Sequence, residues 1–347
     1  MGIIKLPKSS VKFFEENYQD IFETGSLAEG KWNNSCADLV KELTEIKYSI
    51  TVSSNGTGMA ALIQMVEREY GKKRVFIQSN TMYGVKTMVK ASGASYEGEI
   101  NCDSILLVPT LEMVKDSVSD ISDKKNLLII LSHIGGIINP WIEDISEFCE
   151  EEGIVLLEDC AHSYGSTLNG KHSGSFGAGG VYSFYSTKAI PSGEGGMIVT
   201  NDKILGELCS KYVMYDRFDR ELEIANNIRQ SEIQALLLYS VLNCTNEIIE
   251  DKRKTASNYI KICNEKKIEY LDQEGSNKGN YYKFILSSND KNVQNLYKSI
   301  NNSTSQVYDY ALGASLEIVN SHVCLPIWYK QEDNLTNSVV KELEQLF

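Results

Sequence analysis

Short apolar runs recur between residues 47 and 200, and most of them are apolar on both faces. Such runs predict strands that are buried on both sides of a sheet. The predicted strands are Tyr48–Val52, Arg74–Gln78, Ile105–Pro109, Leu127–Leu131, Ile154–Glu158, Gly180–Phe184 and Met197–Thr200. Between many of them the apolar positions take helical spacing, as in Gly58–Glu69 and Trp141–Glu152. This alternation predicts an open α/β sheet covered by helices.

The pattern changes after residue 230. Ser231–Tyr259 contains neither Gly nor Pro and predicts one long helix. A polar loop, a strand and a helix are then expected at Asp272–Asn280, Tyr281–Leu286 and Lys291–Ile300. We therefore expect a large α/β domain over residues 1–244, including an N-terminal segment 1–46, and a small α+β domain over residues 245–347.

Composition and charge narrow the class of partner. The hydrophobic fraction of 42% and the charged fraction of 23% are typical of a globular protein. A net charge of −13 argues against a nucleic-acid partner, because a phosphate backbone requires a basic face. A single phosphorylated small molecule remains compatible with this charge, since a nest of backbone N–H groups can hold it.

The spacing of the cysteines and the lengths of the hydrophobic segments indicate whether the protein binds a metal and where in the cell it is expected. None of the eight cysteines has CxxC spacing, so we expect free buried thiols and no metal site. The N-terminus lacks the apolar run of a signal peptide, and no stretch reaches membrane-spanning length. We therefore expect a soluble cytoplasmic protein without a membrane partner.

Two residues near the middle of the chain suggest chemistry. Asp159 ends an apolar strand, and ligands of open α/β sheets bind beyond the carboxyl ends of strands. It can hold a protonated heterocyclic nitrogen, or it can simply cap the next segment. Lys188 lies between a predicted buried strand and the glycine-rich Gly193–Gly196. A Schiff-base lysine must lose its proton, which burial favours; the alternative is an ordinary surface lysine.

A third element is Ser53–Gly58, at the predicted start of a helix. Glycine permits close backbone approach, and a helix N-terminus offers N–H groups to an anion. A plain cap and turn is equally compatible. The segment has neither P-loop spacing nor a dinucleotide fingerprint. Together, a carboxylate, a lysine and an anion-binding helix start describe a site for pyridoxal phosphate (PLP).

At these motifs the chain resembles the DegT/DnrJ/EryC1/StrS family of sugar aminotransferases, which are fold-type I PLP-dependent enzymes. Glu158–Gly165 resembles the EDAAQ/H-x-x-G motif, and Gly174–Lys188 with Gly193–Gly196 resembles GSFGDxGxFSFxxxK…GEGG. Further matches are Ser54–Thr57 to SNGT, Asn227–Ala235 to NxRMSELQAA, and Gly25–Gly30 to a loop near the front. The matches extend roughly from residue 25 to residue 240.

The resemblance implies a role for each matching residue. Lys188 binds PLP as an internal aldimine and then acts as general acid and base, and Asp159 pairs with the pyridine nitrogen. His162 lies near the 3-hydroxyl of the cofactor. The phosphate is held by Gly56, Thr57 and Ser183, together with Asn227 of the neighbouring subunit. The implied assembly is a homodimer with shared active sites.

The chain departs from the family pattern at two places. In the family, an aromatic residue stacks on the PLP ring. This chain has Met82 at that position, followed by Tyr83, and either side chain can take that role. The small C-terminal domain is shorter than usual, and no match is found to the family's Pro-and-His segment ahead of Cys324–Pro326. Substrate contacts from that domain are therefore not predicted.

For three further residues the sequence allows both a role in the site and a purely structural role. His133 resembles a family position near the site, and a structural histidine is equally compatible. Arg217 and Arg229 can meet substrate phosphates or form surface ion pairs.

The resemblance implies an aminotransferase that passes an amino group from an amino acid, expected to be glutamate, to a nucleotide-linked keto-sugar. Two alternatives stay open. A PLP-dependent sugar dehydratase of this family has histidine in place of the Schiff-base lysine, whereas this chain keeps Lys188. A non-catalytic regulator that binds PLP or a sugar nucleotide is compatible with the short C-terminal domain. The sequence names neither the nucleotide nor the sugar.

Overall fold

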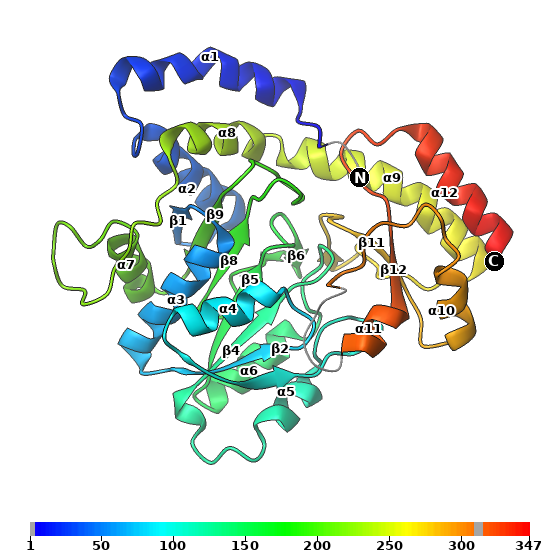
Figure 1. The fold of residues 1–347 in the computed structure, drawn as a ribbon, viewed down its shortest axis with the longest axis horizontal. Helices are drawn as coiled ribbons and strands as arrows, with labels where there is room; N and C mark the ends of the chain where they lie inside the picture. Colours follow the sequence, from blue (N-terminus) through cyan, green and yellow to red (C-terminus); the bar gives the residue numbers. More distant parts are fainter. Residues whose placement is uncertain (1–3, 309–314) are drawn as a thin grey trace.

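The fold is organised around a mostly parallel sheet of seven strands (Figure 1). The computed structural model describes residues 4–308 and 315–347. The strand order is β1-β9-β8-β5-β4-β2-β3, and only β9 runs antiparallel to its neighbours within this sheet. The strands are β1 (Tyr48–Val52), β2 (Arg74–Gln78), β3 (Ser95–Ile100), β4 (Leu127–Ser132), β5 (Val155–Cys160), β8 (Gly179–Ser183) and β9 (Gly196–Thr200). The predicted α/β class is confirmed.

Helices cover both faces of this sheet because successive strand residues point to opposite sides. Leu157 of β5 packs with the helices of one face, α3 (Asn55–Tyr70), α4 (Tyr83–Ala91) and α7 (Lys203–Tyr212). On the other face, Leu156 packs against α5 (Leu111–Val118) and α6 (Ile142–Glu151). Cys160, on the same side, packs with α1 (Lys8–Thr24), α2 (Lys31–Thr44) and α8 (Glu232–Leu242).

One predicted strand is wrong. Residues 105–109 form a turn, in which Asp103 Oδ1 accepts the N–H groups of Ile105 and Leu106 and Leu107 has φ +62°. Leu107 is nevertheless fully buried, which explains why the run looks like a strand. The strand at one edge of the sheet is β3, whose polar residues alternate with less polar ones because it is only partly buried.

The long predicted helix consists of two helices, α8 and α9 (Thr245–Lys266). The break falls at Asn243 and Cys244, where side chains compete for backbone carbonyls. Asn243 Nδ2 donates to Tyr239 O, and Thr245 Oγ1 donates to Leu242 O.

The C-terminal part contains a two-stranded sheet of β11 (Phe284–Ser287) and β12 (His322–Leu325). Around it lie α9 and α10 (Lys291–Tyr297), α11 (Ser315–Ser321) and α12 (Asp333–Leu346), with α12 beside α9 (Figure 1). Tyr259, Phe284 and Leu343 belong to one buried cluster here. The division of domains at residue 244 stays a prediction.

Short elements connect the two parts. β10 (Asn277–Lys278), within the predicted polar loop, pairs with β6 (Thr167–Leu168), which also pairs with β7 (Lys171–His172). A 3-10 turn, η1 (Lys124–Asn126), precedes β4. Within residues 4–308 and 315–347, none of the helices combines the length and apolar character that crossing a membrane requires.

Candidate active site

Asp159 lies at the carboxyl end of β5, next to Ser132 of β4 and Val181 of β8 in register. Its buried carboxylate accepts three hydrogen bonds. Oδ1 accepts from Asn55 Nδ2 and from the Ala161 N–H, both at 3.1 Å, and Oδ2 accepts from Ser132 Oγ at 3.0 Å. Because a carboxylate oxygen can accept two hydrogen bonds, Oδ2 keeps one acceptor position for a ligand.

The start of α3 is placed beside this carboxylate. Asn55, the first residue of α3, also donates to Val181 O at 2.8 Å, which ties the helix to β8. The N-cap Ser54 accepts the Thr57 N–H at 3.2 Å. Gly196 permits the close packing, since a Cβ there would lie 2.5 Å from the carbonyl carbon of Ser54.

The predicted phosphate-binding residues lie in this region. Gly56 and Thr57 are in the first turn of α3. Ser183, at the end of β8, is the direct partner of Gly196 in β9. The glycine that lets α3 approach the sheet thus also brings Ser183 near the helix start.

Lys188 lies in the turn that follows β8, where its N–H donates to Tyr185 O at 2.9 Å. Burial lowers the pKa of its amine to about 8; the Asp159 carboxylate opposes the shift and the Lys283 ammonium adds to it. The amine lies 5.1 Å from the centre of the Tyr282 ring. A lysine with this pKa is neutral in a substantial fraction of molecules at mildly alkaline pH.

His162 is buried and contacts two tyrosine rings. The ring centres of Tyr282 and Tyr308 lie 4.2 Å and 5.3 Å from that of His162, and Tyr308 Oη is 2.9 Å from His162 Nε2. Burial, with the charges of Lys188 and Lys283, holds the pKa of His162 well below its usual range, so the ring is neutral. Nδ1 is buried and has no protein partner.

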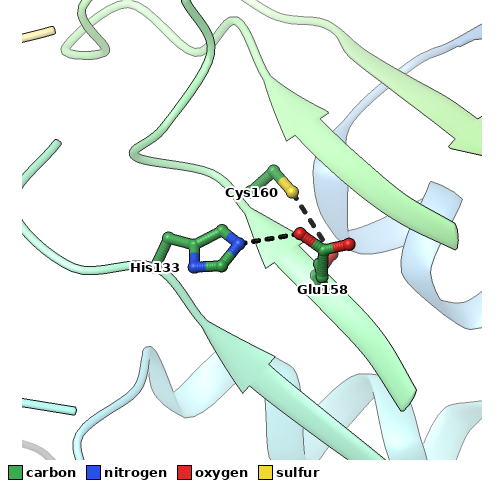
Figure 2. A group of neighbouring side chains, drawn as sticks. All are labelled: His133, Glu158 and Cys160. Atoms are coloured by element: carbon green, nitrogen blue, oxygen red, sulfur yellow. Dashed lines mark hydrogen bonds and ion pairs between the residues drawn. The ribbon is translucent and has the colours of Figure 1, made fainter. Parts of the chain in front are cut away.

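A second cluster, His133, Glu158 and Cys160, lies next to the site (Figure 2). Glu158 Oε1 accepts the N–H groups of Phe176 and Gly177 at 2.8 Å. Its Oε2 accepts from the Gly174 N–H at 2.7 Å and from His133 Nε2 at 2.9 Å. The motif glutamate therefore fixes the glycine-rich loop that leads into β8.

The ligand-type atoms of this cluster lie within 4.8 Å of one another, yet they are already engaged. The Asn139 N–H donates to His133 Nδ1 at 3.1 Å, so Nε2 carries the proton that bonds to Glu158. Burial, with the charges of Glu158 and Asp159 adding to it, raises the pKa of the Cys160 thiol well above its usual range. We therefore assign the cluster a structural role, and His133 follows its structural interpretation.

Met82 and Tyr83 lie at the start of α4, with 50% and 56% of their surfaces exposed. Both side chains are accessible, and which of them stacks on a ring stays open.

Asn227 is exposed, and its Oδ1 accepts from Arg229 Nε at 2.9 Å. Arg217 and Arg229 both pair with Glu29 at 2.6 Å, which matches their ion-pair interpretation. Partial burial raises the pKa of Glu29, but the two arginines outweigh it and hold the pKa below its usual value. The predicted contact of Asn227 with a neighbouring subunit stays a prediction.

We assigned no role from the sequence to several residues that complete the site, namely Asn55, Ser132, Tyr282, Lys283 and Tyr308. Ser132 could have been found, because it ends the strand next to β5 and must share an edge with Asp159. The last three come from the C-terminal part of the chain, in which no sequence motif indicated a site residue.

Comparison with known proteins shows the family of this chain. The sequence profile of the DegT/DnrJ/EryC1/StrS aminotransferase family matches residues 8–344. GDP-perosamine synthase of Vibrio cholerae is 28% identical over 246 residues, covering 69% of this chain and 65% of that protein. GDP-perosamine synthase of Escherichia coli O157:H7 is 30% identical over 232 residues, covering 64% and 60%. The match thus spans less than two thirds of either relative.

A solved structure shows the fold over the whole chain. Helicobacter pylori PseC, an aminotransferase involved in the biosynthesis of pseudoaminic acid, superposes with a TM-score of 0.84 at 18% identity, covering 99% of this chain and 97% of PseC. This neighbour confirms the expected fold-type I architecture, and the family profile extends over almost the same residues. The chain belongs to the DegT/DnrJ/EryC1/StrS aminotransferase family.

Proposed function

We propose that this protein is a PLP-dependent aminotransferase that transfers an amino group from an amino acid, glutamate in the first instance, to a nucleotide-linked keto-sugar. The observation that carries the proposal is the meeting of Asp159, His162 and Lys188 beside the start of α3. The similarity to two GDP-perosamine synthases supports a nucleotide-linked sugar as the acceptor.

The residues present fit the cofactor. Asp159 Oδ2 has an acceptor position left for a protonated ring nitrogen, and the buried Nδ1 of His162 lacks a partner that a ring hydroxyl would supply. Lys188 offers an amine for the covalent linkage. Gly56, Thr57 and Ser183 would hold the phosphate at the helix N-terminus.

When bound, PLP supplies an electron sink for the carbanion formed at the substrate carbon. Lys188 moves the proton at that carbon, as base in one half of the reaction and as acid in the other, and its pKa of about 8 suits both directions. The three donors on Asp159 fix the orientation of its carboxylate. The neutral His162 ring, in contact with Tyr282 and Tyr308, would orient a hydrogen bond to the ring hydroxyl of PLP without adding a positive charge.

The proposal includes a homodimer with shared active sites, in which Asn227 of one subunit reaches the phosphate site of the other. Its support is that Asn227 is exposed and that two large apolar residues of the same segment of the chain, Phe218 and Ile224, are 75% and 60% exposed. Co-expression of a Lys188→Ala chain with an Asn227→Ala chain should restore activity, because one site of each mixed dimer is then intact. Absence of recovery in isolated mixed dimers would contradict shared sites.

A cytoplasmic location also belongs to the proposal. Its support is that all eight cysteines are free, as is usual for proteins of a reducing compartment.

The visible absorbance of the purified protein with PLP tests the proposed activity. We expect a band from lysine-bound cofactor that glutamate bleaches and that Lys188→Ala lacks. Lys278→Ala, which removes an exposed lysine of β10, is the matched control and should behave as wild type. A band that no amino acid alters would favour the non-catalytic regulator. Absence of the band in the wild type would refute the proposal.

A further inference from the structure

A second lysine, Lys283, lies beside the site and has no role in the chemistry described above. Its amine lies 5.9 Å from the centre of the Tyr282 ring, and the Lys188 amine lies 5.1 Å from the same ring. The charge of Lys283 reaches both Lys188 and His162, whose pKa values it helps to lower. Lys283 is thus part of the electrostatic environment of the site.

The backbone of Lys283 is held firmly against the large sheet. Its N–H donates to Gly135 O at 2.9 Å, and its carbonyl accepts from Gln273 Nε2 at 2.7 Å. Gly135 and Gly136, in the loop after β4, have φ values of +72° and +108°, and a Cβ on Gly136 would collide with Asn280. The loop is therefore shaped to receive residues 280–283, and the position of Lys283 is preorganised.

The charges around this position do not balance. The Lys283 amine donates to the neutral Ser305 O at 2.9 Å, and no carboxylate within residues 4–308 and 315–347 lies in ion-pair range of it. The Asp159 carboxylate, whose charge acts on Lys188, accepts from Asn55, Ser132 and the Ala161 N–H. The Lys283 ammonium group, bonded to a neutral carbonyl oxygen, is therefore able to bind an incoming anion.

We propose that Lys283 binds the oxyanion of a substrate as it reaches Lys188. The identity of the substrates rests on the proposed function, which supplies two sources of such a group. One is the carboxylate of the amino-acid donor, and the other is the diphosphate of the nucleotide-linked sugar. Both are recognised by the same chemistry, a charge-assisted hydrogen bond from an ammonium group.

Isothermal titration calorimetry of the PLP-saturated protein separates the two sources. Glutarate represents the donor without its amine, and GDP, UDP and dTDP represent the nucleotide. Lys283→Met should weaken binding of one class about tenfold, the scale of one charge-assisted hydrogen bond. Lys283→Arg should keep the affinity within about threefold, since the charge remains. Lys278→Met, the exposed control, should leave both affinities unchanged.

Each outcome decides the inference. Weaker glutarate binding alone assigns Lys283 to the donor carboxylate, and weaker diphosphate binding alone assigns it to the nucleotide. Unchanged affinity of Lys283→Met for both classes, or no binding by the wild type, overturns the inference. The unfolding midpoint of Lys283→Met should stay near that of the wild type, which separates anion binding from loss of the Ser305 contact.

Failure of this inference is distinguishable from failure of the proposed function. Suppose that the wild type forms the PLP band, that glutamate bleaches it, and that Lys283→Met binds every anion as tightly as the wild type. This result refutes the role of Lys283 and leaves the proposed function intact. If the wild type shows no band but its anion binding depends on Lys283, the proposed function alone is refuted.

Discussion

Replacing Glu158 by glutamine should destabilise the protein through the loop that leads into β8. Each oxygen of the fully buried carboxylate accepts two hydrogen bonds, Oε1 from Phe176 and Gly177 and Oε2 from Gly174 and His133. In the glutamine variant, the amide nitrogen takes the place of one of these two oxygens. Because that nitrogen cannot accept, the two N–H groups that pointed at the oxygen lose their acceptor. Hydrogen bonds to a charged group contribute about 1.5–3 kcal/mol each, so the loss of two such bonds should lower the free energy of unfolding by about 3–6 kcal/mol.

Thermal unfolding followed by circular dichroism measures this loss. With about 2.1 cal/mol/K per residue, 347 residues give an unfolding entropy of about 0.7 kcal/mol/K, so the midpoint should fall by about 4–8 °C. Glu207→Gln removes an exposed carboxylate 3.8 Å from Lys203 and should change the midpoint by less than about 1 °C. A Glu158→Gln midpoint equal to that of this control would refute the anchoring role of Glu158.

Three further predictions concern the site. Asp159→Asn keeps the size of the side chain but removes its charge, so single-turnover conversion of the bound cofactor by glutamate should slow on the order of 100-fold; a rate within a few-fold of wild type would contradict the role of the carboxylate. Gly196→Ala places a Cβ 2.5 Å from the Ser54 carbonyl carbon, so the start of α3 must shift and equilibrium dialysis should show weaker PLP binding, whereas unchanged affinity would contradict the packing argument. The pKa of Lys188 is lowered to about 8, so its amine is protonated below that pH and neutral above it. PLP capture by the apoprotein, followed by stopped-flow absorbance, should therefore accelerate as the pH rises through about 8, and a flat profile would count against a free amine at Lys188.

The central strands were predictable because burial on both faces leaves continuous apolar runs, as in Leu127–Leu131. Strand β3, at one edge of the sheet, was not predictable in this way, because only part of it is buried and its sequence is polar. The buried Leu107 was mistaken for strand because it packs with Ile134 and Ile285 in tertiary contacts that no local pattern encodes. Burial alone thus does not distinguish a strand from a buried turn.

The site residues also fall into those that were predictable from the sequence and those that were not. Asp159 and Lys188 were predictable because each ends or follows a buried strand within a recognisable motif. Tyr282, Lys283 and Tyr308 reach the site only through tertiary folding, across more than a hundred residues from His162. Glu158 belongs to the motif, but its role as the anchor of residues 174–177 becomes apparent only from its four hydrogen bonds.

The most direct test of the central claim is to locate the lysine that carries the cofactor. Borohydride reduction of the PLP-saturated protein makes the linkage permanent, and peptide mass spectrometry then identifies the modified residue. We expect a single major modification at Lys188, whose pKa of about 8 distinguishes it from an exposed lysine. Modification at Lys283 or another lysine, or none at all, would contradict the assignment of Lys188 as the cofactor-binding lysine.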